Sequence, residues 1–285
     1  MSGVFLVGAT GPLGRAIARE LAGRGHAVQG ISRSGGLGSA RLDVTDTKLL
    51  RIALRAARPA AVIDLSRPEL PDGGAADAAV DGALAAHRQF LTACAEEGVE
   101  RLIFASSAAV YGTSSAKPHA EGEPLPQAGS YARLKSGSEL NISAAADSGA
   151  FAELALALRI FNLYGPGFSD SLVTRLVERT HPAPTVYVSD SFVRDYIYGG
   201  DVARAIVGAI DGPPIGPHLL NLGTGVGTSN NDLLATLPDS IFTASHDLAS
   251  PSYSVADMTL ARATLRLTSF VTIADAVDRW RDAKN

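Results

Sequence analysis

The chain has 285 residues, which is long for one domain, so we expect one large unit with a smaller lobe beside it. It is 46% hydrophobic, no apolar run approaches the length of a membrane span, and residues 1–15 do not resemble a secretory signal, so we expect a soluble cytoplasmic protein without a membrane partner. The net charge of −4, with both signs dispersed, gives no reason to expect a nucleic-acid partner, and the single cysteine, Cys94, excludes an intrachain disulfide.

The first predicted elements are a short strand, a glycine-rich turn and a helix. The apolar run 3–7 leads into Gly8-Ala-Thr-Gly11-Pro-Leu-Gly14, and a helical pattern follows. In a dinucleotide-binding fold, such a turn brings the backbone close to a pyrophosphate at the positive end of a helix. Gly8 would permit the tight turn, Gly11 would leave room for the dinucleotide, and Gly14 would let the helix close onto the strand. The other cofactor-binding candidates of this turn are Thr10, Pro12 and Leu13.

Short apolar runs alternate with helical stretches over roughly the first 165 residues. The predicted strands are 3–7, 27–32, 60–65, 101–106 and 155–161, with helices such as 46–58 and 78–97 between them. This alternation predicts an α/β fold with a doubly wound parallel sheet of the Rossmann type. Beyond Gly165 prolines interrupt the pattern, and two more strand candidates follow at 185–188 and 218–222. We therefore predict an NAD(P)-binding Rossmann domain over 1–165, to which 191–222 returns, and a smaller substrate-binding lobe over 166–285.

The end of the second predicted strand bears on the choice of cofactor. A fold that binds NAD usually places a carboxylate there for the ribose 2′-hydroxyl, whereas an arginine suits the 2′-phosphate of NADP. Here the strand ends in Ser32-Arg33-Ser34 without an acid, so the sequence favours NADP(H), with NAD(H) as the alternative. A little later Asp43, followed by Val44, ends a short predicted strand. Its carboxylate could accept a hydrogen bond from an adenine amino group or cap the next helix.

Candidate catalytic side chains lie between residues 101 and 135. The buried strand 101–106 delivers the hydroxyls of Ser106 and Ser107 at its carboxyl end, where parallel sheets bind their ligands. Tyr131 and Lys135 are four residues apart, so they share one face of a helix. The ammonium and an oxidised nicotinamide would favour the phenolate and make Tyr131 a general acid or base, with a serine hydroxyl holding the substrate oxygen. The alternative is an exposed helical pair without a catalytic role.

At this point the chain resembles a known family, the extended short-chain dehydrogenases/reductases, and within it the group of nucleotide-sugar epimerases, dehydratases and reductases. The resemblance covers nearly the whole length and rests on motifs in a fixed order. These are Gly8-Ala-Thr-Gly11-Pro-Leu-Gly14, Asp43-Val44, Ser106-Ser107-Ala-Ala-Val-Tyr111-Gly112, Tyr131-x-x-x-Lys135, Arg159-Ile-Phe-Asn162-Leu-Tyr164-Gly165-Pro166, Arg194-Asp-Tyr-Ile-Tyr-Gly-Gly-Asp201-Val202 and Asn221-Leu-Gly-Thr-Gly225.

The resemblance implies roles for individual residues. Ser107, rather than Ser106, is the catalytic hydroxyl, Tyr131 is the acid/base, and Lys135 also holds the nicotinamide ribose. Substrate contacts are expected for Ser107 itself and, on the diphosphate side of a nucleotide sugar, for Asn162 and Arg194. Homodimers are common in the family.

The chain also departs from the family pattern. Asp64-Leu65-Ser66-Arg67 replaces the commoner His-Leu-Ala-Ala run beside the cofactor. Leu65, Ser66 and Arg67 are thus cofactor-binding candidates, although Arg67 could equally reach an anionic substrate or lie at the surface. Ala108-Ala109 stands where 4,6-dehydratases carry an Asp-Glu pair, which counts against dehydration. The six histidines lack metal-ligand spacing, so no metal site is expected.

Other polar and aromatic residues are interpreted as structural. Asp195 and Asp201 flank a predicted strand and are expected to cap or bridge rather than catalyse. Residues 228–231 are typical of a helix start. Trp280, with apolar residues at helical spacing before it, indicates the inner face of a closing helix.

Three hypotheses about function follow. The leading one is an NADPH-dependent reductase that delivers hydride to a keto group of a nucleotide-activated deoxysugar, with Tyr131 protonating the oxygen and Ser107 orienting it. The alternative is an NAD-dependent nucleotide-sugar 4-epimerase that uses the same residues and never releases its cofactor. A catalytically silent dinucleotide-sensing protein is the third, and the presence of Tyr131 and Lys135 counts against it.

Overall fold

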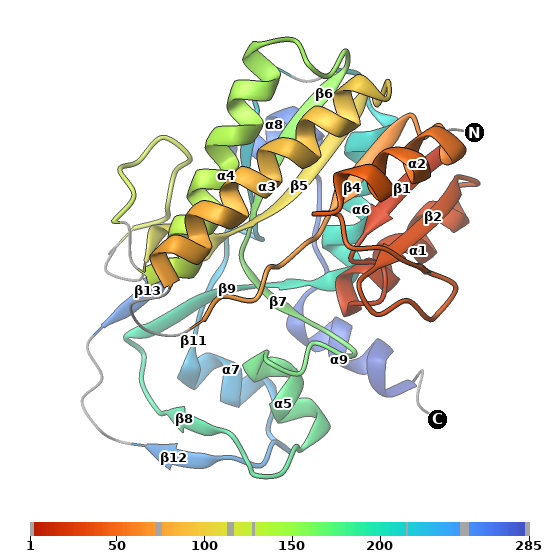
Figure 1. Cartoon of the computed structure of the whole chain (residues 1–285). Coiled ribbons are helices and arrows are strands. Elements are labelled where there is room, and N and C mark those ends of the chain that lie inside the picture. Colours follow the sequence, from red (N-terminus) through yellow and green to blue (C-terminus); the bar gives the residue numbers. More distant parts are fainter. Residues whose placement is uncertain are drawn as a thin grey trace.

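The computed structural model describes residues 3–71, 76–112, 117–126, 129–214, 216–245 and 251–282 (Figure 1). Its strands are β1 Gly3–Val7, β2 Ala27–Ser32, β3 Ala40–Arg41, β4 Ala61–Asp64, β5 Arg101–Ser107, β6 Leu154–Ile160, β7 Asn162–Tyr164, β8 Thr185–Tyr187, β9 Phe192–Tyr198, β10 Leu219–Leu222, β11 Gly227–Ser229, β12 Thr243–Ser245 and β13 Ser252–Ser254. Its helices are α1 Pro12–Gly23, α2 Thr47–Ala57, α3 Ala76–Glu96, the 3-10 turn η2 Ala108–Tyr111, α4 Gly129–Asp147, α5 Leu172–Glu178, α6 Gly199–Asp211, α7 Asn230–Thr236, α8 Thr259–Leu265 and α9 Ile273–Asp282.

The central sheet of the described chain has seven parallel strands in the order β3-β2-β1-β4-β5-β6-β10. The strand order reverses between β1 and β4, as it does in dinucleotide-binding sheets, and ligands of such sheets bind outside the carboxyl ends at this reversal. Gly8, Leu65 and Ala108 follow directly on β1, β4 and β5 and therefore lie along this edge. The predicted doubly wound parallel sheet is confirmed.

Helices cover both faces of this sheet. In β1, Val4 and Leu6 pack into a core that also contains Ile17 of α1, whereas Phe5 on the opposite face packs with Leu50 of α2. Because both faces are buried, the strand is a continuous apolar run rather than an alternating one. Full burial of each such side chain contributes about 1.5–3 kcal/mol. Figure 1 shows α3 and α4 lying side by side on the second face.

Part of the chain after Gly165 returns to the sheet. α6 packs beside α1, and β10 forms the edge strand next to β6. The expected return of 191–222 is wrong for its first element, because β9 pairs with β7, β11 and β13 in a separate sheet. With the pair β8-β12, this sheet and α5, α7 and α9 form the lower part of Figure 1. The boundary of the two lobes at residue 165 stays a prediction.

Several local predictions are confirmed. Predicted strands 3–7 and 27–32 have the predicted ends, and the other predicted strands and helices differ by only one or two residues. Ser229 caps α7 by accepting a hydrogen bond from the Asp232 N–H, and Trp280 is buried on α9. None of the described helices combines the length and apolarity required to cross a bilayer.

Candidate active site

The glycine-rich turn has the geometry expected of a pyrophosphate cradle. Gly8 has a φ of +81°, which a residue with a side chain rarely adopts, and this confirms its role in the turn. A Cβ on Gly14 would lie 2.3 Å from the Gly8 carbonyl oxygen, which confirms that α1 closes onto β1 there. Gly11 precedes α1 without a side-chain cap, so the first N–H groups of the helix remain available to an anion. These residues fit the pyrophosphate of a dinucleotide.

A cavity of about 780 Å³ opens from this turn along the sheet edge. Ten of the predicted cofactor-binding residues line it, namely Gly8, Thr10, Gly11, Ser32, Arg33, Asp43, Val44, Leu65, Ser66 and Arg67. Five others do not line it: Tyr131 and Lys135 belong to α4, and three belong to the start of α1. Pro12 borders a neighbouring cavity, the Leu13 side chain is buried in the core, and Gly14 packs against the turn. Leu13 could therefore meet a cofactor only through its backbone.

Carboxylates lie at the far end of this cavity, beside Arg33. The Arg33 guanidinium is 3.2 Å from a Glu69 carboxylate oxygen, in a pair whose side chains are 59% and 90% exposed. Asp43 accepts hydrogen bonds from the N–H and hydroxyl of Thr45, which hold the pKa of its carboxyl below the usual value. Of the two roles left open for Asp43, the helix cap is wrong, because Asp46 is the N-cap of α2 and Asp43 lies one turn too early.

Lys135 lies at the centre of the catalytic candidates. Its Nζ donates hydrogen bonds to the carbonyl oxygens of Ala105 at 2.8 Å and Ser66 at 3.4 Å, and it is 6.0 Å from the Tyr131 ring centroid. The residue is only 4% exposed. Burial lowers the pKa of Lys135 to about 8, and the nearby Asp64 carboxylate opposes this shift. The two residues therefore share a helix face, as predicted, but Lys135 is not an exposed helical residue.

Ser107 ends β5 next to this group. Its hydroxyl oxygen accepts a hydrogen bond from the Ala109 N–H at the start of η2, which leaves its own O–H able to donate. Ser106, the neighbouring candidate, is buried and its hydroxyl donates to Glu139 at 2.5 Å. The structure thus separates the two hydroxyls. Ser107 borders a cavity, whereas Ser106 belongs to the interior.

Two further residues, Asp64 and His87, line the cavity at the glycine turn, which we call the cofactor cavity, and were not assigned from the sequence. Asp64 is 1% exposed and accepts a hydrogen bond from the Ser66 N–H at 2.8 Å. The His87 Nε2 lies 3.7 Å from its other oxygen. Burial lowers the pKa of His87 to about 4, so the imidazole is neutral near pH 7. The unusual acid at position 64 was the only sequence signal, because His87 is far from it along the chain.

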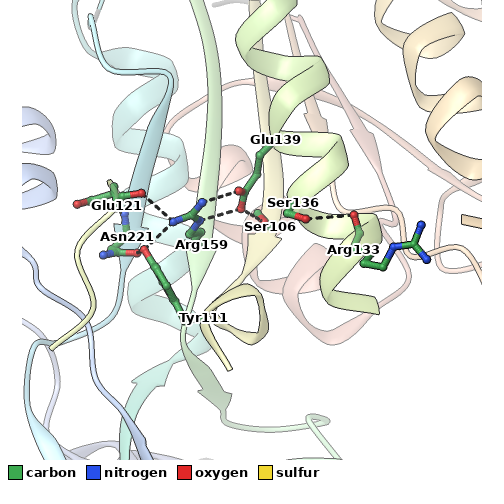
Figure 2. Close-up of polar contacts among 8 residues, drawn as sticks. All are labelled: Ser106, Tyr111, Glu121, Arg133, Ser136, Glu139, Arg159 and Asn221. Carbon is green, nitrogen blue, oxygen red and sulfur yellow. Dashed lines mark hydrogen bonds and ion pairs between the residues drawn. The ribbon is translucent and has the colours of Figure 1, made fainter. Parts of the chain in front are cut away.

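A buried ion pair connects α4, the helix that carries Tyr131 and Lys135, to the sheet (Figure 2). Glu139 lies on α4 one turn after Lys135, and its carboxylate receives two hydrogen bonds from Arg159 of β6, at 3.0 and 2.7 Å. The same carboxylate accepts the hydrogen bond from Ser106. The α4 face that carries Tyr131 and Lys135 is therefore fixed to β5 one residue before Ser107.

The network continues on the other side of Arg159. Its guanidinium donates to the Tyr111 hydroxyl at 2.8 Å and to the Glu121 carbonyl at 3.0 Å. Tyr111 donates in turn to the Asn221 side chain at 2.7 Å, as Figure 2 shows. Burial raises the pKa of Tyr111 to about 12, so this phenol stays protonated. Tyr111 therefore acts as a structural hydrogen-bond donor.

A second cavity, of about 800 Å³, lies between the central sheet and the second part of the chain. Ser107 and the two residues expected near a diphosphate, Asn162 and Arg194, line it together with Arg67 and Arg175. The Arg194 guanidinium lies 3.9 Å from the Phe192 ring centroid and donates to the carbonyl and hydroxyl of Ser252. The expected substrate residues are therefore brought together.

Asp195 and Asp201 are structural, as predicted, but Asp195 lies within β9 rather than beside a strand. Asp195 is fully buried and accepts hydrogen bonds from the N–H groups of Thr224, Gly225 and Ala256. Asp201 forms an ion pair with Arg204 and accepts a bond from the N–H of Val271. Both carboxylates tie separate segments together.

The NAD dependent epimerase/dehydratase family gives a sequence match over residues 4–223, which is most of the chain. That stretch contains the glycine turn, the Ser107, Tyr131 and Lys135 group, and Arg194. The chain belongs to this family.

Among curated members of the epimerase/dehydratase family, UDP-glucose 4-epimerase from Corynebacterium glutamicum is 32% identical over 157 residues, which are 49% of this chain and 47% of that protein. UDP-glucose 4-epimerase 1 from Oryza sativa subsp. japonica is 32% identical over 170 residues, or 51% of this chain and 48% of that protein. The chain thus spans about half the length of the curated relatives it matches.

Solved structures of the epimerase/dehydratase type have the same fold over almost the whole chain. UDP-glucose 4-epimerase from Brucella ovis in complex with NAD superposes with a TM-score of 0.82 and 26% identity, covering 97% of this chain and 96% of that chain. MoeE5 in complex with UDP-glucuronic acid and NAD gives a TM-score of 0.83 at 24% identity, covering 99% and 100%.

Proposed function

We propose that the chain is an NAD-dependent nucleotide-sugar 4-epimerase. The observation that carries the proposal is the position of the catalytic group between two cavities. Ser107 borders the cavity that contains Asn162 and Arg194, while Lys135 is bonded to Ser66 of the cavity at the glycine turn. Family membership and the curated relatives, which are UDP-glucose 4-epimerases, support the same reaction class. The epimerase thus replaces the reductase, which the sequence favoured, as the leading hypothesis.

The chain's own residues supply acid–base chemistry and orientation. Ser107 donates a hydrogen bond to the sugar oxygen, and Tyr131 removes the hydroxyl proton as the carbon–hydrogen bond breaks. A bound NAD, which the glycine turn and the start of α1 would hold, would supply the hydride acceptor and donor for the sugar carbon. Tyr131 then gives the proton back to the oxygen, which restores the hydroxyl with inverted configuration. The Lys135 ammonium, 6.0 Å from the Tyr131 ring centroid, places a positive charge beside the group that exchanges the proton.

Each of the two cavities contains positively charged or N–H groups that can bind a phosphate. The free N–H groups at the start of α1 suit the cofactor pyrophosphate. Arg194 and Arg175 suit the diphosphate of the nucleotide sugar, because guanidinium groups form paired hydrogen bonds with phosphate oxygens.

A second candidate, an NADPH-dependent ketoreductase of nucleotide sugars, is favoured by Arg33. This arginine lines the cofactor cavity, and β2 ends at Ser32 without an acid. Its pair with Glu69 is exposed on both sides and contributes at most about 1 kcal/mol, so Arg33 is able to turn toward a 2′-phosphate. The Asp43 carboxylate, held near Arg33, opposes that phosphate and favours NAD.

The test separates the two candidates by their need for cofactor. An epimerase purifies with NAD bound and interconverts a UDP-sugar and its C4 epimer, assayed with UDP-glucose and with UDP-glucuronate, without added cofactor, whereas a reductase requires NADPH and consumes it stoichiometrically. In the Tyr131→Phe variant, turnover should fall at least a hundredfold while cofactor binding stays within about twofold. Unchanged turnover in Tyr131→Phe would refute the assigned chemistry.

A further inference from the structure

Arg67 occupies a boundary between the two cavities. It follows the carboxyl end of β4 and lines both the cofactor cavity and the substrate cavity. Its guanidinium carbon is 5.3 Å from the Tyr131 ring centroid, and Ser107 borders the same substrate cavity. Arg67 therefore lies at the reacting end of the substrate rather than at its nucleotide end.

The backbone before Arg67 is firmly held. The Ser66 N–H donates to the buried Asp64 carboxylate at 2.8 Å, and the Ser66 carbonyl accepts from Lys135. Pro68 follows, and its ring restricts the backbone on the other side. The exposed side chain of Arg67 thus extends from a fixed base, which reduces the entropy lost when it binds a ligand.

The arginines that line the substrate cavity come from two sides of it, two from one side and one from the other. Arg175 of α5 and Arg194 of β9 come from the chain beyond Gly165, whereas Arg67 comes from the opposite side. Among the described residues that line this cavity, Asp170 is the only carboxylate. The described part of the chain contains no ion pair of Arg67. A nucleoside diphosphate would neutralise Arg175 and Arg194, but a neutral hexose would leave Arg67 without an anion.

We propose that Arg67 binds an acidic group on the sugar itself, so that the preferred substrate is a nucleotide-linked hexuronate rather than a neutral hexose. A guanidinium pairs with a carboxylate through two parallel hydrogen bonds, which gives both affinity and a defined orientation. The contact would fix the sugar beside Tyr131. This inference rests on the proposed function and narrows its substrate class.

The experiment compares two probes, UDP-glucuronate and UDP-glucose, binding to the NAD-saturated protein in a calorimeter. The wild-type chain should bind UDP-glucuronate at least tenfold more tightly. Arg67→Ala should lose that preference while its affinity for UDP-glucose stays within about threefold, and Arg67→Lys should keep part of it. Arg175→Ala is the matched control, because loss of a cation at the nucleotide end should weaken both probes equally.

Other binding results would contradict the inference or separate it from the proposed function. Equal affinity of the wild-type chain for both probes, no binding of either, or a parallel loss of both in Arg67→Ala overturns the inference. A selective loss of NAD affinity in Arg67→Ala also overturns it, since Arg67 would then serve the cofactor. If UDP-glucuronate is preferred but no sugar is interconverted, the proposed epimerase fails while the acidic-sugar site stands.

Discussion

The buried ammonium of Lys135 opposes folding, because burial penalises its charged form. Its pKa of about 8 in the folded chain lies below the ordinary value of 10.5. Below pH 8 the group is charged in both states, and the full destabilisation is present. Between pH 8 and 10.5 only the unfolded chain binds the proton, so stability rises with pH, and above 10.5 the effect has ended.

We predict that Lys135→Met abolishes this pH dependence. Relative to the variant, the wild-type chain should gain about 3 kcal/mol of unfolding free energy between pH 7 and 10.5. Urea unfolding of both proteins at the two pH values measures the difference. The lost hydrogen bond to Ala105 affects both pH values alike and cancels in this comparison. If the free energies of unfolding of the two proteins differ by the same amount at both pH values, Lys135 is not buried as a charged group.

Two glycines of the same helix should respond to alanine in opposite directions. A Cβ on Gly14 would lie 2.3 Å from the Gly8 oxygen and 2.7 Å from the Ala9 Cα, so Gly14→Ala should destabilise the chain by about 1–3 kcal/mol. Gly23 has no atom within 4 Å of such a Cβ, and Gly23→Ala should stabilise α1 by up to about 1 kcal/mol. Denaturant midpoints of the two variants check this. Equal changes in stability in Gly14→Ala and Gly23→Ala would contradict the close packing of α1 on the turn.

At the scale of elements, the Glu139–Arg159 pair holds α4 against the sheet. Replacing either residue by leucine leaves a buried charge without its partner, so each single variant should lose about 3–5 kcal/mol. The double variant should lose much less than the sum, because no lone charge remains. Urea unfolding of the full cycle measures the coupling, and strictly additive losses would show that the pair is not coupled.

If the Glu139–Arg159 pair served only to stabilise the fold, the double variant would be fully active at any temperature at which it is folded. We expect its kcat to fall at least tenfold at a temperature where it is folded, with KM within about threefold, because α4 also carries Tyr131 and Lys135. Leu140→Ala, at an exposed position of the same helix, is the control and should leave kcat unchanged.

The sequence predicted elements well where a local pattern defined them. Strand β1 has its predicted ends because it is a buried apolar run that stops at a glycine, and β2, although only its last two residues are buried, stops where the polar loop after Ser32 begins. The position of β9 was not predictable, since pairing with β7, β11 and β13 depends on tertiary packing rather than on its own residues. Likewise Asp64 and His87 meet only because α3 covers β4. Glu69, in the segment after β4, reaches Arg33, in the segment after β2, so the charge balance of the cofactor cavity could not be read along one strand.

At the scale of the molecule, the two cavities draw on different parts of the chain. The described residues that line the cofactor cavity all lie between Val7 and Phe90, whereas most of those lining the substrate cavity lie beyond Asn162. Arg67 is shared by both. Two ligands should therefore stabilise the fold from separate surfaces that meet at Arg67.

We predict that NAD and UDP raise the stability of the chain additively. Each ligand at a hundred times its dissociation constant should add about 2.7 kcal/mol, because it binds only the folded state. Thermal unfolding with NAD, with UDP and with both measures the two increments. If UDP stabilises only in the presence of NAD, the substrate cavity forms only after the cofactor binds, which would contradict two preformed sites.

Two variants assign the increments to their cavities. Gly11 has a φ of −67°, so alanine fits its backbone, and the nearest atom to the added Cβ is the Gly8 oxygen at 3.4 Å. Gly11→Ala should thus fold normally but lose the NAD increment, because the methyl group occupies the approach of the pyrophosphate. Arg175→Ala should lose most of the UDP increment and keep that of NAD. Loss of both increments in either variant would mean that the cavities open and close as one unit, since a contact confined to one ligand cannot remove the stabilisation by the other.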